Sequence, residues 1–357
     1  MKLTFARSNG AVDELIDTLM ETVGGIRHPA IIREMFITAL KSGQENDYPA
    51  DLKLILSTMK EMRYTNKVFA PYRERRKVTI FGSARTPPDD PVYRSCLRFS
   101  RELADRGYMI ITGGGPGIMQ AGNEGAGSDN SFAVNIRLPF EQATNPVMSD
   151  TPRLITYKYF FNRKVAFVRE AQAIAVFPGG FGTLDEAMEV FTLIQTGKTS
   201  PKPLVLIDDG KGFWDNWLAF IKQRLLGMSL ISGEDFSLFT LTSDVDEAVA
   251  VIENFYRNYH SIRFVNGKLV IRLNRALEPE EIRTIETEFP ELLEPGTRIT
   301  MTPPLPGEQD EPDLLHLPRI LMSFDHHHYG LLIACIWRIN AFPPLAPIKL
   351  SPCEEKS

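Results

Sequence analysis

Two glycine-rich turns are the residues of this sequence best suited to binding a reactive ligand. The turn at 178–182 reads PGGFG and follows the apolar run Ala173–Phe177. The turn at 113–117 reads GGGPG and follows the apolar run Tyr108–Thr112. A glycine-rich turn between a strand and a helix can point several backbone N–H groups at one anion. We therefore predict that the fold brings both turns together around one phosphorylated ligand.

The PGGFG turn continues into residues that could add chemistry to phosphate binding. Its glycines let a ligand approach because they carry no Cβ. Thr183 could act as a helix N-cap or as a phosphate ligand. Asp185 and Glu186 would then fall in the first helical turn, where acids interact favourably with the helix dipole. Beside an anion site, the same acids could also act on a phosphorylated sugar.

A pair of cations, Arg163-Lys164, lies in the helix predicted for Tyr159–Glu170. The pair could be solvated, but the residues at 165–167 are apolar, which favours a largely buried helix. A buried arginine needs an anionic partner. The acid of the PGGFG segment and a bound phosphate are the candidate partners for Arg163.

The segment GGGPGIM at 113–119 differs from a dinucleotide-binding fingerprint. Isoleucine occupies position 118, where that fingerprint has its third glycine, and no acidic residue ends the following strand to hold a ribose. The turn also follows the second strand of the unit rather than the first. These differences argue against NAD. The glycines fit either a single phosphate or a close crossing of two chain segments.

The elements that position these residues alternate between short apolar runs and helical patterns. We expect strands at Val78–Phe81, Tyr108–Thr112, Phe132–Leu138, Ala173–Phe177, Pro203–Ile207 and Phe236–Leu241. We expect helices at Pro91–Arg106, from the GGGPGIM segment to about Gly125, and at Tyr159–Glu170, Thr183–Thr196, Trp214–Leu225 and Val245–Tyr259. This alternation predicts an α/β protein with a Rossmann-like, doubly wound parallel sheet. Ligands of such sheets bind beyond the carboxyl ends of the strands, where both glycine turns lie.

The chain is predicted to have four parts. A helical N-terminal extension covers 1–76, with three apolar stripes typical of a core or a subunit contact. A nucleotide-binding domain covers 77–260, and a small α+β appendage covers 261–340. Residues 341–357 are expected to form a disordered tail.

Within the appendage, Asn266-Gly267 predicts a hairpin between two short strands. Pro279–Glu288 suits a helix because proline is favoured in the first helical turn. We expect a second strand pair, Arg319–Phe324 and Leu331–Ile339, around His326–His328. Three consecutive side chains at a hairpin tip cannot easily converge on one ion, so a polar turn is favoured over a metal site.

Composition bounds the class of protein. Apolar residues make up 43% and charged residues 24% of the 357 residues, as in ordinary globular proteins. A net charge of −5 gives no reason to expect nucleic acid or an anionic membrane as partner. Three widely spaced cysteines do not indicate a disulfide framework. No apolar run approaches the roughly 20 residues of a membrane helix, and we expect a soluble, cytoplasmic protein.

Taken together, the motifs between 77 and 259 resemble the LOG family, the cytokinin riboside 5′-monophosphate phosphoribohydrolases once described as lysine decarboxylases. The resemblance is carried by GGGPGIM at 113–119, by Arg163-Lys164 and by PGGFGTLDE at 178–186, which fits the family pattern PGGxGTxxE. FGSAR at 81–85 and LIQTGK at 193–198 look like the longer bacterial members. Phe161-Asn162 differs from the Met-His-x pattern of plant-type members, and the two extensions are absent from the short enzymes.

The resemblance implies hydrolysis of the N-glycosidic bond of an AMP-like nucleoside 5′-monophosphate, giving free base and ribose 5-phosphate. It implies no cofactor and no metal, and a site completed across a homodimer interface. Glu186 would be the catalytic carboxylate that stabilises an oxocarbenium-like ribosyl centre and orients water. Arg163, the second catalytic residue, would position Glu186 and the ribose or phosphate, with Lys164 adding charge. The substrate-binding residues would be Ser83, Gly113, Gly114, Gly115, Gly117, Met119, Lys164, Gly179, Gly180, Gly182, Thr183, Asp185 and Thr192.

Two other functions are compatible with the same motifs. The chain also resembles molybdenum-cofactor carrier proteins, which would make it a binding protein without hydrolysis. The presence of both Arg163 and Glu186 favours an enzyme. A regulatory sensor, with an effector bound by the extensions, is a further possibility that no motif marks. Lysine decarboxylation is disfavoured because no lysine has the context of a pyridoxal-binding residue.

Overall fold

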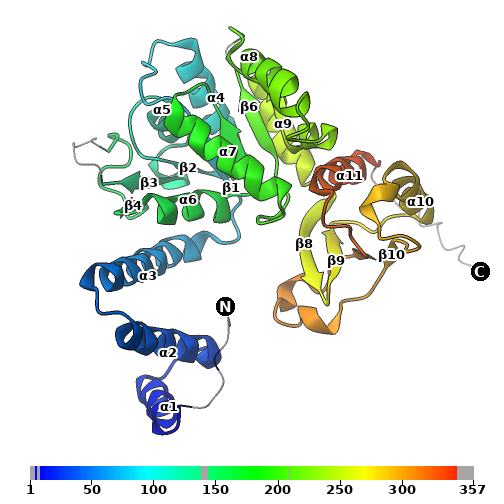
Figure 1. The fold of residues 1–357 in the computed structure, drawn as a ribbon. Coiled ribbons are helices and arrows are strands. Elements are labelled where there is room, and N and C mark those ends of the chain that lie inside the picture. The colour runs from blue at the N-terminus through cyan, green and yellow to red at the C-terminus, as the bar shows by residue number, and fades with distance from the viewer. Residues whose placement is uncertain (1–4, 6–8, 138–143, 209, 344–357) are drawn as a thin grey trace, which may run out of the picture. The chain divides into compact units, whose positions relative to one another are not determined.

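The computed structural model describes residues 5, 9–137, 144–208 and 210–343 (Figure 1). The chain forms two compact units, Met1–Asn66 and Lys67–Ser357. The finer division at 260 stays a prediction, and most of the predicted tail, 344–357, lies outside the described residues.

The first unit is helical, as predicted. It contains α1 (Ala11–Val23), α2 (Pro29–Glu45) and most of α3 (Pro49–Phe69). Its small core is built on Ile16, Met20 and Ile37. Other apolar side chains of the predicted stripes are exposed, namely Val12, Leu15, Leu19, Val23, Ile31, Met35, Leu40, Ile55 and Met59. The stripes therefore form a core only in part.

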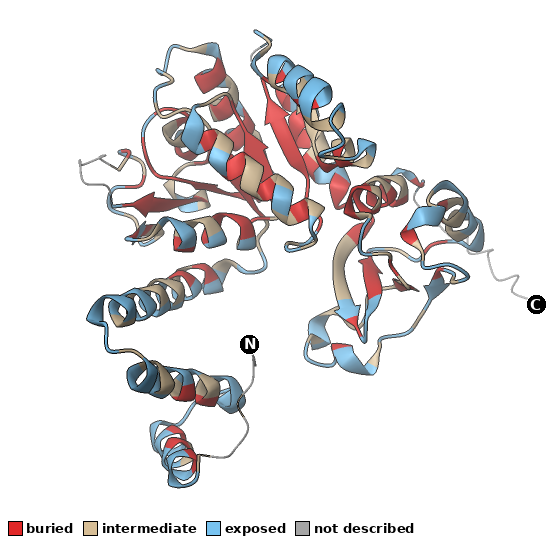
Figure 2. Cartoon of the chain, viewed as in Figure 1, coloured by how far each residue is buried: buried red, intermediate tan, exposed pale blue. Residues whose placement is uncertain are grey.

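The second unit is built on a seven-stranded parallel sheet with the strand order β4-β3-β2-β1-β5-β6-β7. Its strands are β1 (Lys77–Phe81), β2 (Met109–Thr112), β3 (Ser131–Ile136), β4 (Leu154–Tyr157), β5 (Ala173–Val176), β6 (Leu204–Ile207) and β7 (Thr240–Thr242). The central strands are buried along their whole length (Figure 2). This confirms the predicted Rossmann-like α/β fold.

Helices cover both faces of this sheet because successive side chains of each strand point to opposite faces. The helices are α4 (Pro91–Asp105), α5 (Ile118–Ala126), α6 (Phe160–Arg169), α7 (Phe181–Gln195), α8 (Phe213–Phe220) and α9 (Val245–Phe255). In β5, Ile174 and Val176 share a core with α6 and α7, whereas Ala173 and Ala175 share the other core with α4 and α9.

Two strand predictions in this unit need correction. The edge strand β4 was missed, because its four residues are only partly buried and give a weak pattern. The strand predicted at Phe236–Leu241 begins only at Thr240. A 3₁₀ turn, η4 (Gly233–Leu238), occupies its first half, and the side chains of Ser232 and Asp235 cap that turn.

The C-terminal part of the second unit adds an antiparallel sheet of order β10-β11-β9-β8. Its elements are β8 (Tyr259–Val265), β9 (Lys268–Leu273), α10 (Pro279–Glu288), β10 (Thr300–Met301), β11 (Arg319–Met322) and α11 (Tyr329–Ala341). The predicted hairpin is confirmed between β8 and β9. Asn266 and Gly267 have φ values of 51° and 78°, as a type I′ turn requires.

The strand predicted at Leu331–Ile339 is wrong, because this segment lies in α11. The helix packs against α7, α9, β8 and η4, so it is buried on most sides. Its apolar run therefore lacks the one-sided period of a surface helix and cannot be told from a buried strand.

His326–His328 form a turn before α11, and each imidazole has a different neighbour. His326 stacks on Phe264, while His327 lies 2.7 Å from Asp325 and His328 lies 3.0 Å from Glu234. Among the described residues, no group of three or more potential metal ligands converges. In that same part of the chain, no helix is long and apolar enough to span a membrane.

Gly117 allows a close crossing between the start of α5 and the loop after β1. Its φ is +67°, and a Cβ there would overlap Ser83 O and the backbone of Ala84. Ser83 O accepts a hydrogen bond from Ile118 N at 3.0 Å across this crossing. Of the two roles left open for the GGGPG glycines, chain crossing is therefore the role of Gly117.

Gly117→Ala should destabilise the protein more than Gly127→Ala. Gly127 has a φ of +73° with no atom near its Cβ position, so its substitution costs about 1–2 kcal/mol of backbone strain alone. Gly117→Ala adds a steric overlap with backbone, roughly 1–3 kcal/mol more. Urea unfolding of both variants measures this difference, and equal losses of stability would contradict the crossing.

Candidate active site

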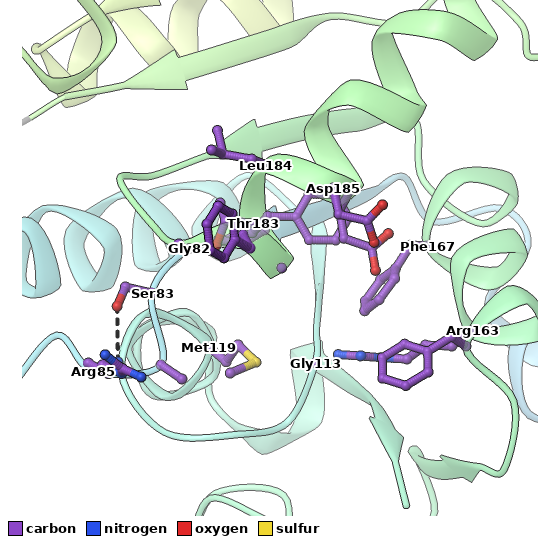
Figure 3. Close-up of a pocket in the computed structure, with 18 residues that line it drawn as sticks. Gly82, Ser83, Arg85, Gly113, Met119, Arg163, Phe167, Thr183, Leu184 and Asp185 are labelled. Atoms are coloured by element: carbon purple, nitrogen blue, oxygen red, sulfur yellow. Dashed lines mark hydrogen bonds between the residues drawn. The ribbon is translucent and has the colours of Figure 1, made fainter. Parts of the chain in front are cut away.

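A pocket of about 700 Å³ opens at the carboxyl ends of β1, β2 and β5 (Figure 3). It is lined by the loop after β1, by Gly113 after β2, by part of α6 and by the first residues of α7. Gly113 belongs to the GGGPG turn and Gly180 belongs to the PGGFG turn. The fold therefore brings the two turns to one pocket.

The predicted site residues separate into two groups. Those that line the pocket are Ser83, Gly113, Met119, Arg163, Gly180, Gly182, Thr183, Asp185 and Glu186. Those outside its lining are Gly114, Gly115, Gly117, Lys164, Gly179 and Thr192. Thr192 is exposed on α7, where its hydroxyl donates to Met188 O at 2.9 Å.

Two of the glycines outside the lining, Gly114 and Gly179, leave no room for a side chain, whereas Gly115 contributes a backbone acceptor. Gly114 has a φ of +71°, and a Cβ there would lie 2.9 Å from the Ala133 side chain. Gly115 O accepts a hydrogen bond from the Asn145 amide at 3.2 Å. A Cβ on Gly179 would overlap Thr183 Oγ1, so this glycine makes room for the threonine side chain.

Helix α7 begins earlier than the sequence suggested. Gly180 is its N-cap residue, and Leu184 N donates the first intrahelical bond to Gly180 O at 3.0 Å. Thr183 is thus inside the first turn rather than at the N-cap, and Asp185 and Glu186 lie beyond that turn. The N–H groups at 181–183 precede the helical ladder, as at any helix start, and can face an anion.

Arg163 reaches across Gly113 into the pocket (Figure 3). Its Nε donates to Val134 O at 2.8 Å, and its guanidinium lies 5.0 Å from the centre of the Phe167 ring. A Cβ on Gly113 would overlap Arg163 Nη2, so this glycine is required for the arginine's position. Burial lowers the pKa of Arg163, and the nearby Glu186 carboxylate opposes that shift.

Lys164, rather than Arg163, makes the ion pair with Glu186. Its Nζ lies 3.7 Å from Glu186, 2.8 Å from Asp185 and 2.7 Å from Glu189. That Arg163 positions Glu186 stays a prediction. Consecutive residues of a helix point about 100° apart, so Arg163 turns toward β3 while Lys164 turns toward α7.

Glu186 is a buried carboxyl with an unusual protonation equilibrium. The residue is 8% exposed. Burial raises its pKa to about 7, against the opposing effect of Lys164 and Arg163. Glu189 and Asp185 raise the pKa further, since like charges disfavour ionisation. Near neutral pH the group is thus present in both forms, as expected of a group that acts in catalysis.

Comparison with known proteins relates this chain to a family. The family model described as "possible lysine decarboxylase" matches residues 117–252. Cytokinin riboside 5′-monophosphate phosphoribohydrolase LOG2 of Arabidopsis thaliana is 28% identical over 153 residues, which cover 42% of this chain and 70% of the plant protein. The chain belongs to the LOG family.

A second relative and a solved structure extend the comparison. The pyrimidine/purine nucleotide 5′-monophosphate nucleosidase of Escherichia coli K12 is 29% identical over 163 residues, or 41% of this chain and 35% of that protein. The structure of the molybdenum cofactor binding protein of Rippkaea orientalis is 16% identical with a TM-score of 0.36, covering 50% of this chain and 96% of that one.

Nine of the residues that line the pocket were not among the predicted site residues, and three of them carry side chains suited to contact a ligand. Phe181 occupies the variable position of the LOG-family PGGxGT motif and is 92% exposed, and Phe160 on α6 is 52% exposed. Arg85, in FGSAR, follows Ser83, whose Oγ accepts a hydrogen bond from Arg85 N at 3.0 Å. In a sequence, an aromatic residue is normally assigned to the hydrophobic core. No sequence signal therefore indicated that Phe160 and Phe181 are exposed at the pocket.

Glu186→Gln should stabilise the protein at pH 8 but not at pH 5. In the folded state the carboxyl keeps its proton up to about pH 7, whereas in the unfolded chain it loses the proton near the ordinary glutamate pKa of 4.5. Stability is therefore lost as pH rises through this window, on the order of 1–3 kcal/mol. Glutamine avoids this loss, and Lys164 keeps Asp185 and Glu189 as partners. Urea unfolding at both pH values measures the effect. A variant less stable than wild type at pH 8 would contradict it.

Proposed function

We propose that this LOG-family protein hydrolyses the N-glycosidic bond of nucleoside 5′-monophosphates to free base and ribose 5-phosphate. The observation that carries the proposal is the buried Glu186 carboxyl, with its raised pKa, beside the N-terminus of α7 in one pocket. The names of the plant and bacterial relatives describe the same class of reaction.

The 5′-phosphate would bind at the start of α7. Backbone N–H groups at 181–183 and the Thr183 hydroxyl are suited to its oxygens. Arg85 lines the same pocket and can supply a charge-assisted hydrogen bond. Ser83, Gly113 and Met119 would contact the rest of the nucleotide. The exposed rings of Phe160 and Phe181 offer aromatic surfaces for the base.

Glu186 would act on the water and on the ribose. As the bond from C1′ to the base nitrogen breaks, its electron pair leaves with the base, and positive charge develops on the ribosyl group. The Glu186 carboxylate stabilises that charge and accepts a proton from the water whose oxygen bonds to C1′. The departing base takes up a proton and Glu186 gives up the proton it accepted, so atoms and charge balance. Lys164 holds the carboxylate, and Arg163 binds the ribose or the phosphate.

The first test is a panel of nucleotides: AMP, GMP, CMP, UMP, IMP and isopentenyl-AMP, with released base measured by chromatography. Wild type should release base from at least one of them, and the absence of release from all six contradicts hydrolysis. Stoichiometric binding without turnover would instead support the alternative, a non-hydrolytic carrier. Light scattering on the same sample checks the expected homodimer.

Glu186→Gln should lower kcat by about 10²- to 10³-fold, because it removes the charge that stabilises the transition state. Nucleotide binding should change little. Glu189→Gln is the matched control: Glu189 contacts the same lysine at 2.7 Å but does not line the pocket. Full activity of Glu186→Gln, or equal losses in both variants, would refute the role assigned to Glu186.

The pH profile tests which form of Glu186 is active. A carboxylate with a pKa raised to about 7 predicts that kcat/KM increases with pH and levels off above that value. Lys164→Met removes the largest influence that lowers this pKa, so the midpoint should move upward. A profile that decreases through pH 7 would mean that the protonated acid is the active form.

A further inference from the structure

A second pocket, of about 740 Å³, lies at the amino ends of the parallel strands, opposite the first pocket. Its lining includes Arg76 just before β1, Gln172 just before β5 and Lys202 just before β6. Because these strands are parallel, their amino ends share one edge. The end of α6 and the start of β8 complete the walls. None of the residues assigned to the LOG-family site contributes to it.

The lining of this pocket is strongly cationic, although the chain as a whole carries a net charge of −5. Five lysine and arginine residues line it, together with His260: Arg73, Arg76, Arg169, Lys198 and Lys202. Among the lining residues, all in the described part of the chain, only Glu74 is acidic. Among the lining residues the positive charges therefore exceed the negative charge by four, before His260 is counted. Glu170, beside the lining, lies 4.0 Å from Arg169 and offsets one of them.

Two of these cations are held in place by groups other than carboxylates. Lys202 is 5% exposed, and its Nζ donates to Val168 O at 2.6 Å and to Ala171 O at 2.7 Å. An ammonium has three N–H donors, so one remains. The Arg76 guanidinium lies 4.3 Å from the centre of the Tyr256 ring. Neither contact neutralises the positive charge.

The place of the pocket in the fold explains why side chains supply this charge. At the carboxyl edge of the sheet, the N-terminus of α7 offers backbone N–H groups to an anion. At the amino edge the helices end, and their C-termini carry partial negative charge. An anion can bind there only if cations overcome that charge. Arg169 at the end of α6 and Lys198 just after α7 occupy such positions.

We propose that this second pocket binds a small polyanion that carries two or more phosphate groups. Its volume falls within the usual range for small-molecule sites, roughly 300–1,000 Å³. Guanidinium groups bind phosphate oxygens through two parallel N–H donors, and lysines add point charge. Inorganic polyphosphate and nucleoside di- or triphosphates share this chemistry.

The pocket also contacts the helices that carry the proposed catalytic groups. Val165, Val168 and Arg169 belong to α6, which carries Arg163, and Leu193 belongs to α7, which carries Glu186. A polyanion bound here would shift the ends of both helices, and we expect it to change kcat/KM for nucleotide hydrolysis. This second step rests on the proposed function, whereas binding does not.

Binding is tested by isothermal titration of the full-length protein with inorganic tripolyphosphate at constant ionic strength. One site per chain is expected, with orthophosphate binding more weakly. Arg73→Ala and Lys198→Ala, both at exposed positions, should each weaken binding by about tenfold. Arg101→Ala, at an exposed position on α4 outside the lining, should leave binding unchanged. Circular dichroism checks that the variants are folded.

Three results would overturn the site: no binding to wild type, equal weakening by Arg101→Ala, or loss of binding in Arg85→Ala. The last would place the probe in the first pocket.

A parallel titration of the Arg85→Ala variant with ADP distinguishes the source of the ligand. Tighter binding of ADP than of tripolyphosphate indicates a nucleotide, and weaker binding of ADP indicates an inorganic polyphosphate. If tripolyphosphate binds here but leaves hydrolysis by wild type unchanged, the coupling is refuted and the site stands. If no nucleotide is hydrolysed, the titration still decides the site.

Discussion

Contacts of the loop after β1 with the loop after β5 and with the start of α5 organise the side of the sheet where the strands have their carboxyl ends. Ser83 N donates to Pro178 O at 3.1 Å, which joins the loop after β1 to the loop after β5. Ser83 O accepts from Ile118 N at 3.0 Å, which joins it to the start of α5. A Cβ on Gly82 would overlap the Ile118 side chain. Both glycine turns therefore owe their positions to one short segment that contains Ser83.

The charged side chains of α6 and α7 help to set the protonation of Glu186. Lys164 is shared among three carboxylates, and its closest partners are Asp185 and Glu189 rather than Glu186. The positive charge of Lys164 therefore lowers the pKa of Glu186 only in part, while burial raises it. A closer ion pair with Glu186 alone would keep the group ionised. The arrangement leaves its pKa near the pH at which a general base works best.

Much of the fold could be predicted from the sequence, because a parallel sheet requires continuous apolar runs that alternate with helices. The hairpin at Asn266-Gly267 could also be predicted, because only a few residue types readily adopt the positive φ values of its turn. The failures occurred where the pattern carries little information. Strand β4 is short and at the sheet edge, and α11 is apolar on most sides because several elements surround it.

For the site, the sequence by itself determined the chemical groups: glycines that admit an anion, a carboxyl at 186 and cations at 163 and 164. It also indicated the family, because their order along the chain is specific. Only the tertiary structure decided which cation contacts Glu186, since that depends on how α6 is rotated against α7. The raised pKa of Glu186 arises from its burial, and the cationic pocket at the amino ends of the strands arises where distant segments of the chain meet. Because residues far apart in the sequence create both features, no local sequence pattern predicts them.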